Sequence, residues 1–271
     1  NRLRSDVDAI RPGLEERFSR VERQAEQFEV IKSRVTVIKR IRSLLDDASA
    51  EVTLSITARQ LPEIRDALVD AVDRGVLVLL VVSDVGADPD RETPELDGVA
   101  SVVRTWGEAM PTLLTVDSEA GVVAPPELLR RSTTDRQAIA FAQEQLAPVI
   151  VGSFLGNYWP AATEISTAAP AALPIEYSNF RHTVLQATLQ LRAGVTPRVT
   201  VGGRWTDSDE AAEVTGHVVE AKQGMVEPTN NEFPVQHSLV VETDAETVTV
   251  GGQGAFVEDI EADLVRIEAA E

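Results

Sequence analysis

The sequence contains no cysteine and only three histidines. Without cysteine, the 271-residue chain forms no disulfide bond or zinc–thiolate site and performs no thiol catalysis. His182, His217 and His237 lie far apart and lack the spacing of metal ligands, so we expect no metal and no cofactor. The lack of cysteine fits a cytoplasmic protein.

Long apolar runs are also missing. No run of about 18 apolar residues is present, so we expect no contact with a membrane, and no basic-then-apolar signal peptide opens the chain. Aromatic residues make up only 4% of the chain, against 43% hydrophobic residues, so the core must be built mainly from Val, Ala, Leu and Ile. Because the chain begins at Asn1 instead of Met, we expect it to be part of a longer protein.

Lysine is scarce in a strongly acidic chain. Only three of the 25 basic residues are lysine (Lys32, Lys39 and Lys222), and 44 acidic residues bring the net charge to −19. An acidic surface nearly free of lysine indicates a halophilic protein, and an ordinary acidic soluble protein is the alternative. Such a surface repels nucleic acid phosphates, so DNA contacts are expected outside this chain or near its N-terminus.

Residues 1–48 show the apolar spacing of a coiled-coil helix. One series repeats every seven residues, and a second, interrupted by Arg17 and Gln24, runs beside it. Pro12-Gly13 places the start of the continuous helix near Pro12. We interpret the segment as a dimerising coiled coil; an amphipathic helix packed on its own domain is the alternative. The first series is Val7, Leu14, Val21, Phe28 and Val35.

Residues 49–194 alternate between strand and helix patterns. A strand at 52–56, a helix at 61–74 ending at Gly75, and a continuous apolar strand at 76–82 predict a layered α/β sheet with covering helices. Further strands are expected at 99–105, 113–116, 121–124 and 138–142, and helices at 145–162 and 178–193. The Ala-, Pro-, Ser- and Thr-rich stretch 163–174 is interpreted as a linker.

Residues 195–271 contain short strand patterns separated by turns. Strands are expected at 198–201, 213–222, 236–243, 247–251 and 263–268. With no long helix between them, these strands predict a small antiparallel β-sandwich or barrel. The chain is therefore expected to combine an α/β domain with an all-β domain.

Gly251-Gly252-Gln253-Gly254 is the segment with the most suggestive chemistry. It lacks the spacing of a dinucleotide loop and the lysine of a P-loop. Glycines let a polyhydroxyl ligand approach the backbone, Phe256 or Trp205 could cover a sugar ring, and Glu258 could accept hydroxyl hydrogen bonds. A β-bulge or turn whose glycines serve only the backbone explains the pattern equally well.

These residues and the strands around them resemble the TrmB family of archaeal transcription regulators. The resemblance extends over the chain: a seam-forming helix, an α/β unit resembling phospholipase D, and a β-rich tail. The tail carries most of it, through the segments Gly203–Thr206, Gly216–Val219, Ser238–Glu242 and Val250–Ala262. Phospholipase D enzymes require HxKxxxxD, and none of the three histidines is followed by lysine two positions later. The resemblance therefore implies a scaffold with no catalytic residues.

The resemblance further implies the sugar-sensing effector region of a regulator of sugar metabolism or transport genes. A sugar, glucose or a maltose-type saccharide, would bind between the α/β and β domains and signal through the helix. Family contacts fall on Gly252, Gln253, Phe256, Val257 and Glu258. Gln253 stands where the family often has an apolar residue, which leaves the identity of the sugar open.

Further contacts are expected from His237 and from Asn179 and Arg181 at the start of a helix. The alternatives are a strand histidine with satisfied hydrogen bonds and an arginine that serves only as an ion-pair partner. The resemblance also implies a homodimer that contacts DNA only through a winged-helix domain absent from this chain. An enzyme of phosphodiester or glycoside hydrolysis and a purely structural dimerisation module remain alternatives.

Overall fold

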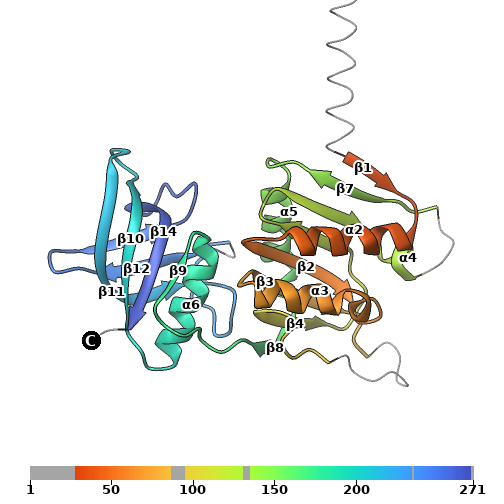
Figure 1. Ribbon diagram of the computed structural model, residues 1–271, viewed down its shortest axis with the longest axis horizontal. Coiled ribbons are helices and arrows are strands. Elements are labelled where there is room, and N and C mark those ends of the chain that lie inside the picture. The colour runs from red at the N-terminus through yellow and green to blue at the C-terminus, as the bar shows by residue number, and fades with distance from the viewer. Residues whose placement is uncertain (1–27, 87–94, 131–134, 234, 270–271) are drawn as a thin grey trace, which may run out of the picture.

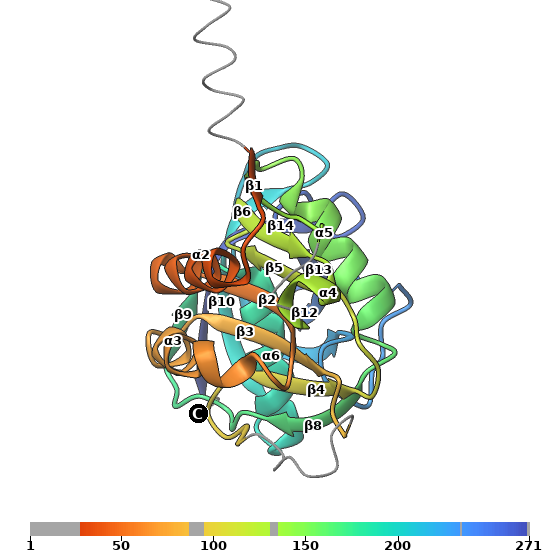
Figure 2. The same cartoon turned by 90° about the vertical axis from the view of Figure 1, so that its right-hand side faces the viewer.

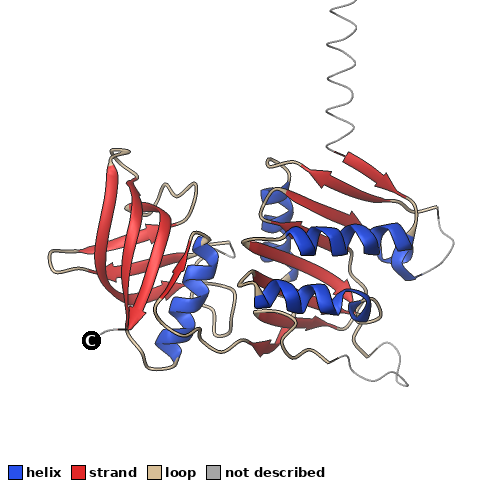
Figure 3. Cartoon of the chain, in the orientation of Figure 1, coloured by secondary structure: helices blue, strands red, loops and turns tan. Residues whose placement is uncertain are grey.

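The computed structural model describes residues 28–86, 95–130, 135–233 and 235–269. They form two subdomains that lie side by side (Figure 1). The first is a mixed α/β sheet with helices on both faces, and the second is a small β-barrel with one helix (Figure 3). The expected combination of an α/β part with a β-rich part is therefore found.

The sheet of the first subdomain has eight strands. Only β2–β3 and β3–β4 are parallel pairs, and all other neighbours are antiparallel. Across the sheet the strands are β1 (Phe28–Ile31), β7 (Ala138–Ala142), β6 (Ala120–Ala124), β5 (Thr112–Val116), β2 (Glu51–Thr57), β3 (Leu77–Ser83), β4 (Val102–Trp106) and β8 (Thr163–Thr167).

The central strand β3 is buried on both faces because helices cover both sides of the sheet. Val78, Leu80 and Val82 point toward α2 (Arg34–Asp47) and α3 (Leu61–Asp73), and the alternate residues Leu77 and Leu79 point the other way. Figure 2 shows α2 and α3 on one side of the sheet and α5 (Ala147–Ser153) on the other. A π-helical turn, η1 (Phe154–Tyr158), continues α5, and the short α4 (Pro126–Arg130) follows β6.

The prediction of a continuous helix through residue 48 is wrong for its described part. Phe28–Ile31 forms β1, which pairs with β7, and only Arg34–Asp47 is helical. That helix, α2, buries Val37, Ile41 and Leu45 against its own subdomain, as the alternative interpretation held. No coiled-coil helix is present in the described residues, and residues 1–27 lie outside them. Pairing with β7 favours a strand here over the helical repeat.

The second subdomain is a closed five-stranded barrel. Each strand pairs with the next, β10 pairs with β14 to close the ring, and all pairs except β13–β14 are antiparallel. The expected barrel is thus present, with one parallel pair. Its strands are β10 (Pro197–Trp205), β11 (Ala211–Lys222), β12 (Ser238–Glu242), β13 (Thr247–Gly251) and β14 (Ile260–Ala269).

The border between the subdomains differs from the one expected at residue 194. The supposed linker contains β8, an edge strand that pairs with β4, and its small polar residues hid the strand pattern. Strand β9 (Ile175–Tyr177) pairs with β14, and α6 (Phe180–Arg192) packs against β9, β11 and β14. Strand β9 and helix α6 therefore belong structurally to the barrel, not to the α/β sheet.

One apolar cluster joins the two subdomains. It includes Leu77 and Leu79 of β3, Phe154 and Trp159 after α5, and Val184 of α6, together with buried barrel residues. Helix α6 is buried on nearly all sides, since it lies against the barrel and within this cluster. The subdomains thus share an apolar contact, in which a buried polar side chain needs hydrogen-bond partners.

Candidate functional site

A cleft of about 890 Å³ lies between the two subdomains. The α/β subdomain contributes Glu51 of β2, Ser118 of the β5–β6 turn, and residues of α5 and η1. The barrel subdomain contributes the start of α6, the end of the β11–β12 loop, and the β13–β14 loop. All eight residues singled out from the sequence line this cleft: Gly252, Gln253, Phe256, Val257, Glu258, His237, Asn179 and Arg181.

The β13–β14 loop, residues 252–259, is held by two side chains that follow its exposed tip. Glu261 accepts the Gly254 N–H at 2.8 Å and the Arg204 Nη2 at 2.8 Å. The Gly254 N–H first, and Arg204 next, hold the pKa of the Glu261 carboxyl below its usual range. Asp259 accepts hydrogen bonds from the backbone N–H and the hydroxyl of Thr249, both at 2.7 Å. The loop backbone is therefore fixed while its tip side chains stay uncommitted.

The tip of this loop presents apolar surface to water. Phe256 is 86% exposed and Val257 is 77% exposed, although both line the cleft. Gln253 is also exposed, and Glu258 is half-buried beside them. An exposed aromatic ring next to a carboxylate and an amide can bind a molecule that has both an apolar face and hydroxyl groups.

Two glycines of this segment have packing roles. A Cβ atom on Gly252 would lie 2.8 Å from Cβ of Phe180, so glycine lets the loop approach the start of α6. A Cβ atom on Gly251 would lie 2.9 Å from the Oε2 atom of Glu258. The structural explanation therefore accounts for these two glycines. The chemistry available to a ligand comes mainly from the side chains of Gln253, Phe256 and Glu258.

The start of α6 is joined to the α/β subdomain by Glu51. Asn179 caps the helix by accepting the His182 N–H at 2.9 Å, and its Nδ2 donates to Oε2 of Glu51 at 3.1 Å. Arg181 donates from Nη1 to Oε1 of Glu51 in an ion pair. Arg181 is thus an ion-pair partner, as one interpretation held, and it also lines the cleft.

Asp117 fixes the backbone that carries Glu51. Its carboxylate accepts the N–H groups of Ser49, Ala50 and Glu51 at 2.8–2.9 Å. Burial alone would raise the pKa of Asp117, but these hydrogen bonds outweigh burial and lower it. Asp117 and Ser118 both have positive φ angles, 53° and 56°, in the tight turn that brings Ser118 to the cleft wall.

His237 lines the cleft, and its two ring nitrogens have different surroundings. Its Nδ1 lies 2.9 Å from the carbonyl oxygen of Val235, so Nδ1 carries the proton that is donated there. Burial, and then the nearby Arg181, lower the pKa of His237 to about 3, which keeps the ring neutral near pH 7. Its Nε2 is buried and has no hydrogen-bond partner among the described residues. A ligand contact by His237 stays a prediction.

Sequence reasoning missed several residues of this site. Glu51, Ser118, Phe233 and Glu261 also line the cleft. The sequence offered one signal, for Glu51. This acidic residue begins the apolar strand β2, and a buried charge at such a position needs a partner. Nothing in the sequence connects Glu51 to Arg181, since the two residues are 130 positions apart.

Two arrangements that could support catalysis are missing from the described residues. Within ranges 28–86, 95–130, 135–233 and 235–269, no group of three or more His, Asp or Glu side chains could hold a metal ion. Asp259 is occupied by Thr249, so it does not form a free carboxylate pair with Glu258. No described helix is long and apolar enough to cross a membrane.

Two family models match consecutive parts of the chain. The model described as "Transcriptional regulator TrmB, EBD N-terminal subdomain" matches residues 27–166, and "TrmB/TrmBL1, EBD C-terminal subdomain" matches residues 172–270. The chain belongs to the TrmB family. Its two subdomains correspond to the two halves of the TrmB effector-binding domain, and the gap between the matches runs from the last residue of β8 to a point before β9.

Comparison with curated proteins finds no match. Among solved structures, the TrmB-family chain is similar to TrmBL2, an archaeal chromatin protein, with 17% identity and a TM-score of 0.44 over 60% of this chain and 66% of that one. It is also similar to Nuc, a phospholipase D family member from Salmonella typhimurium (18% identity, TM-score 0.38, 52% of this chain and 98% of that one). NucT from Helicobacter pylori is 9% identical, with a TM-score of 0.37 over 51% of this chain and 100% of that one.

Proposed function

We propose that this TrmB-family effector domain senses a sugar and that the sugar binds in the interdomain cleft. Glucose or a maltose-type saccharide would contact Gly252, Gln253, Phe256, Val257 and Glu258. His237, Asn179 and Arg181 would add polar contacts from the adjoining walls. The supporting observation is that these eight residues, which come from three separate segments of the chain, line one cleft together with residues of the α/β subdomain.

The chemistry of the cleft suits a pyranose ring. The ring of Phe256 and the side chain of Val257 are exposed at its edge and could cover the apolar face of a sugar. Glu258 can accept hydroxyl hydrogen bonds, which are stronger to a charged group than to a neutral one. The amide of the exposed Gln253 can both donate and accept.

Isothermal titration calorimetry with glucose, maltose and related sugars tests this proposal directly. Binding should release or absorb heat and raise the melting temperature as the sugar concentration exceeds Kd. The same panel should be repeated with E258Q, for which we expect a loss of about 1–3 kcal/mol in binding free energy. E213Q, on an exposed position of β11 outside the cleft, is the matched control. If no sugar of the panel produces heat or shifts the melting temperature, the proposal of sugar sensing is refuted. If E258Q binds sugar with unchanged affinity, Glu258 is not part of the site.

We further propose that the sugar acts on transcription in the cytoplasm through a homodimer of the full regulator. A ligand shifts a conformational equilibrium only if it prefers one arrangement, and here the two cleft walls belong to different subdomains. DNA contact would come from a winged-helix domain, since the acidic effector domain, with its net charge of −19, repels phosphates. The coupling should appear as equal effects of sugar on operator affinity and of operator on sugar affinity in the regulator that carries both domains.

A further inference from the structure

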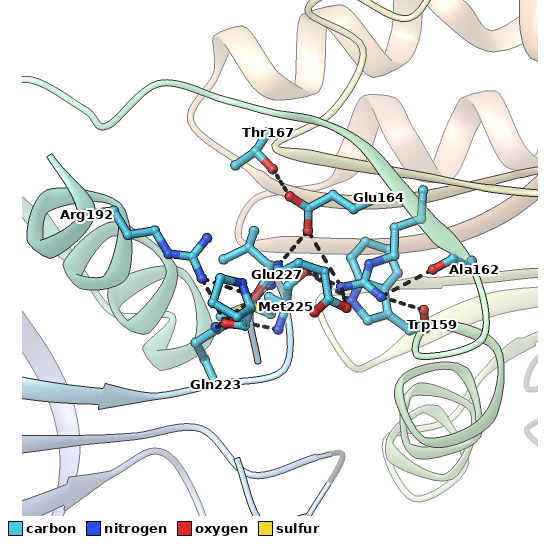
Figure 4. Close-up of polar contacts among 11 residues, drawn as sticks. Trp159, Ala162, Glu164, Thr167, Arg192, Gln223, Met225 and Glu227 are labelled. Carbon is cyan, nitrogen blue, oxygen red and sulfur yellow. Dashed lines mark hydrogen bonds and ion pairs between the residues drawn. The ribbon is translucent and has the colours of Figure 1, made fainter. Parts of the chain in front are cut away.

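Arg104 of β4 is an arginine with no exposed surface at the contact between the subdomains. Its Nη1 donates to the carbonyl oxygens of Trp159 at 2.9 Å and Ala162 at 3.4 Å, both in its own subdomain. Its Nη2 donates across the border to Glu227 Oε1 at 3.2 Å and to the carbonyl of Met225 at 3.4 Å. Figure 4 shows its partners Trp159, Ala162, Met225 and Glu227 close together.

Neighbouring groups reinforce the same contact. The guanidinium carbon of Arg104 lies 4.9 Å from the ring centre of Trp159, and the indole N–H of Trp159 donates to the Met225 carbonyl at 3.1 Å. Glu164 of β8 accepts the Glu227 N–H at 2.7 Å and lies 3.6 Å from Arg104 Nη2 (Figure 4). The α/β subdomain therefore binds residues 225–227 through both backbone and side-chain atoms.

Residues 225–227 lie near the start of the long loop 223–237, which connects β11 to β12 and ends at the cleft. The far end of this loop supplies Phe233, Val235, Gln236 and His237 to the cleft wall. In the α/β subdomain, α5 and η1 likewise connect the Arg104 contact with the cleft. Helix α5 and η1 line the cleft with Val151, Gly152 and Leu155, and Trp159 follows directly after η1.

We propose that Arg104 is a positioning residue that fixes loop 223–237 against the α/β subdomain and thereby sets the spacing of the two cleft walls. This inference rests on the proposed function of the cleft. Arg104 does not line the cleft, so it would act on a ligand only through the loop and through Trp159. The side chain of Glu227 is 55% exposed, so its contact with Arg104 can break without burying a lone carboxylate. The bonds to Trp159 and Ala162 keep Arg104 in place within its own subdomain.

The absence of cysteine allows a direct test of wall spacing. Cysteines introduced at the exposed positions Asp70 of α3 and Glu220 of β11 would be the only thiols for spin labels. Double electron–electron resonance should give a narrow distance distribution in the otherwise unchanged chain and a broader or shifted one in R104M. Sugar affinity, measured with the panel above, should fall about 2- to 30-fold in R104M, the range for residues that couple two sites without touching the ligand.

Two further variants make the result decisive. R192Q is the matched control, because Arg192 of α6 binds the same loop at the carbonyls of Val226 and Pro228 but lies in the barrel subdomain. It should leave the interdomain distance unchanged. E227Q keeps Arg104 buried and weakens only the contact across the border, so it should broaden the distribution even if R104M does not fold.

The outcomes separate this inference from the proposed function. Distance distributions and affinities equal to the parent chain in folded R104M and in E227Q would overturn the role of Arg104. An equal broadening in R192Q would also overturn it, because the loop would then respond to any lost contact. If the parent chain binds no sugar, the proposed function fails, while the distance measurements still decide whether Arg104 holds the two subdomains.

Discussion

Replacing Glu51 with Gln removes the charge from a carboxylate that holds the start of α6 against the sheet. The Glu51 side chain is 5% exposed and that of its partner Arg181 is 21% exposed. Breaking a fully buried ion pair costs about 3–5 kcal/mol, because the remaining charge is left without a partner. An exposed pair contributes about 0–1 kcal/mol. Since Arg181 keeps some contact with water, we expect E51Q to lower the free energy of unfolding by about 2 kcal/mol.

Thermal unfolding followed by circular dichroism measures this loss. At about 2–4 °C for each kcal/mol in a chain of this size, E51Q should lower Tm by roughly 4–8 °C. E63Q is the matched control: Glu63 pairs with Arg34, and the two side chains are 36% and 33% exposed. We expect E63Q to change stability by less than about 1 kcal/mol. If E51Q lowers Tm no more than E63Q does, the ion pair does not stabilise the start of α6 as we argue.

Two further predictions concern stability. Because hydrogen bonds lower the folded-state pKa values of Asp117 and Glu261, their contribution is full above the unfolded pKa values, about 4, and is lost as the pH falls through the folded values. Urea unfolding between about pH 6 and pH 3 should therefore show a smaller loss of stability in D117N than in the parent chain, and an equal slope would contradict this. G252A should lower the free energy of unfolding by about 1–3 kcal/mol, because its methyl group meets Phe180. G156A has open space around the new methyl group and should be neutral or stabilising in the same urea assay; similar losses in both variants would refute the packing argument.

The sequence predicted elements whose signal is local. The apolar run at 76–82 indicated a buried parallel strand, and Leu77–Ser83 is the central strand of the sheet. The hairpin around residues 117–120 and the helix ending at Gly75 were found for the same reason, since turn residues and a left-handed glycine mark their ends. These features depend on the residues within one element and its caps.

Elements whose structure depends on distant partners were missed. Phe28–Ile31 fits a seven-residue repeat as well as a strand, and pairing with β7, more than 100 residues away, decides for the strand. Edge strand β8 has few apolar residues, and the three-residue β9 is too short to show a period. A local pattern cannot distinguish a linker from an edge strand that is completed by its neighbour.

The candidate site also contains residues that the sequence predicted and residues that it did not. The five residues of the β13–β14 loop came from the resemblance to TrmB regulators, and the start of α6 was expected to face them. Their partners across the border could not be expected, because Glu51 lies 130 residues from Arg181 and Arg104 lies 121 residues from Met225. Such contacts exist only after both subdomains have folded and docked.

The polar contacts around Glu51 and those around Arg104 should respond differently to a ligand. Arg181 and Glu51 both line the cleft, and Arg181 already donates to Glu51. A ligand hydroxyl that accepts a hydrogen bond from Arg181 would therefore share this donor with Glu51. Arg104 and its partners Trp159 and Met225 do not line the cleft. The apolar cluster between the subdomains has no directional preference of its own. If the proposed function holds, we expect a ligand to shift the walls at the Glu51 side, with the Arg104 side as the pivot. E51Q and R104M should then have distinct effects on the distance between the subdomains.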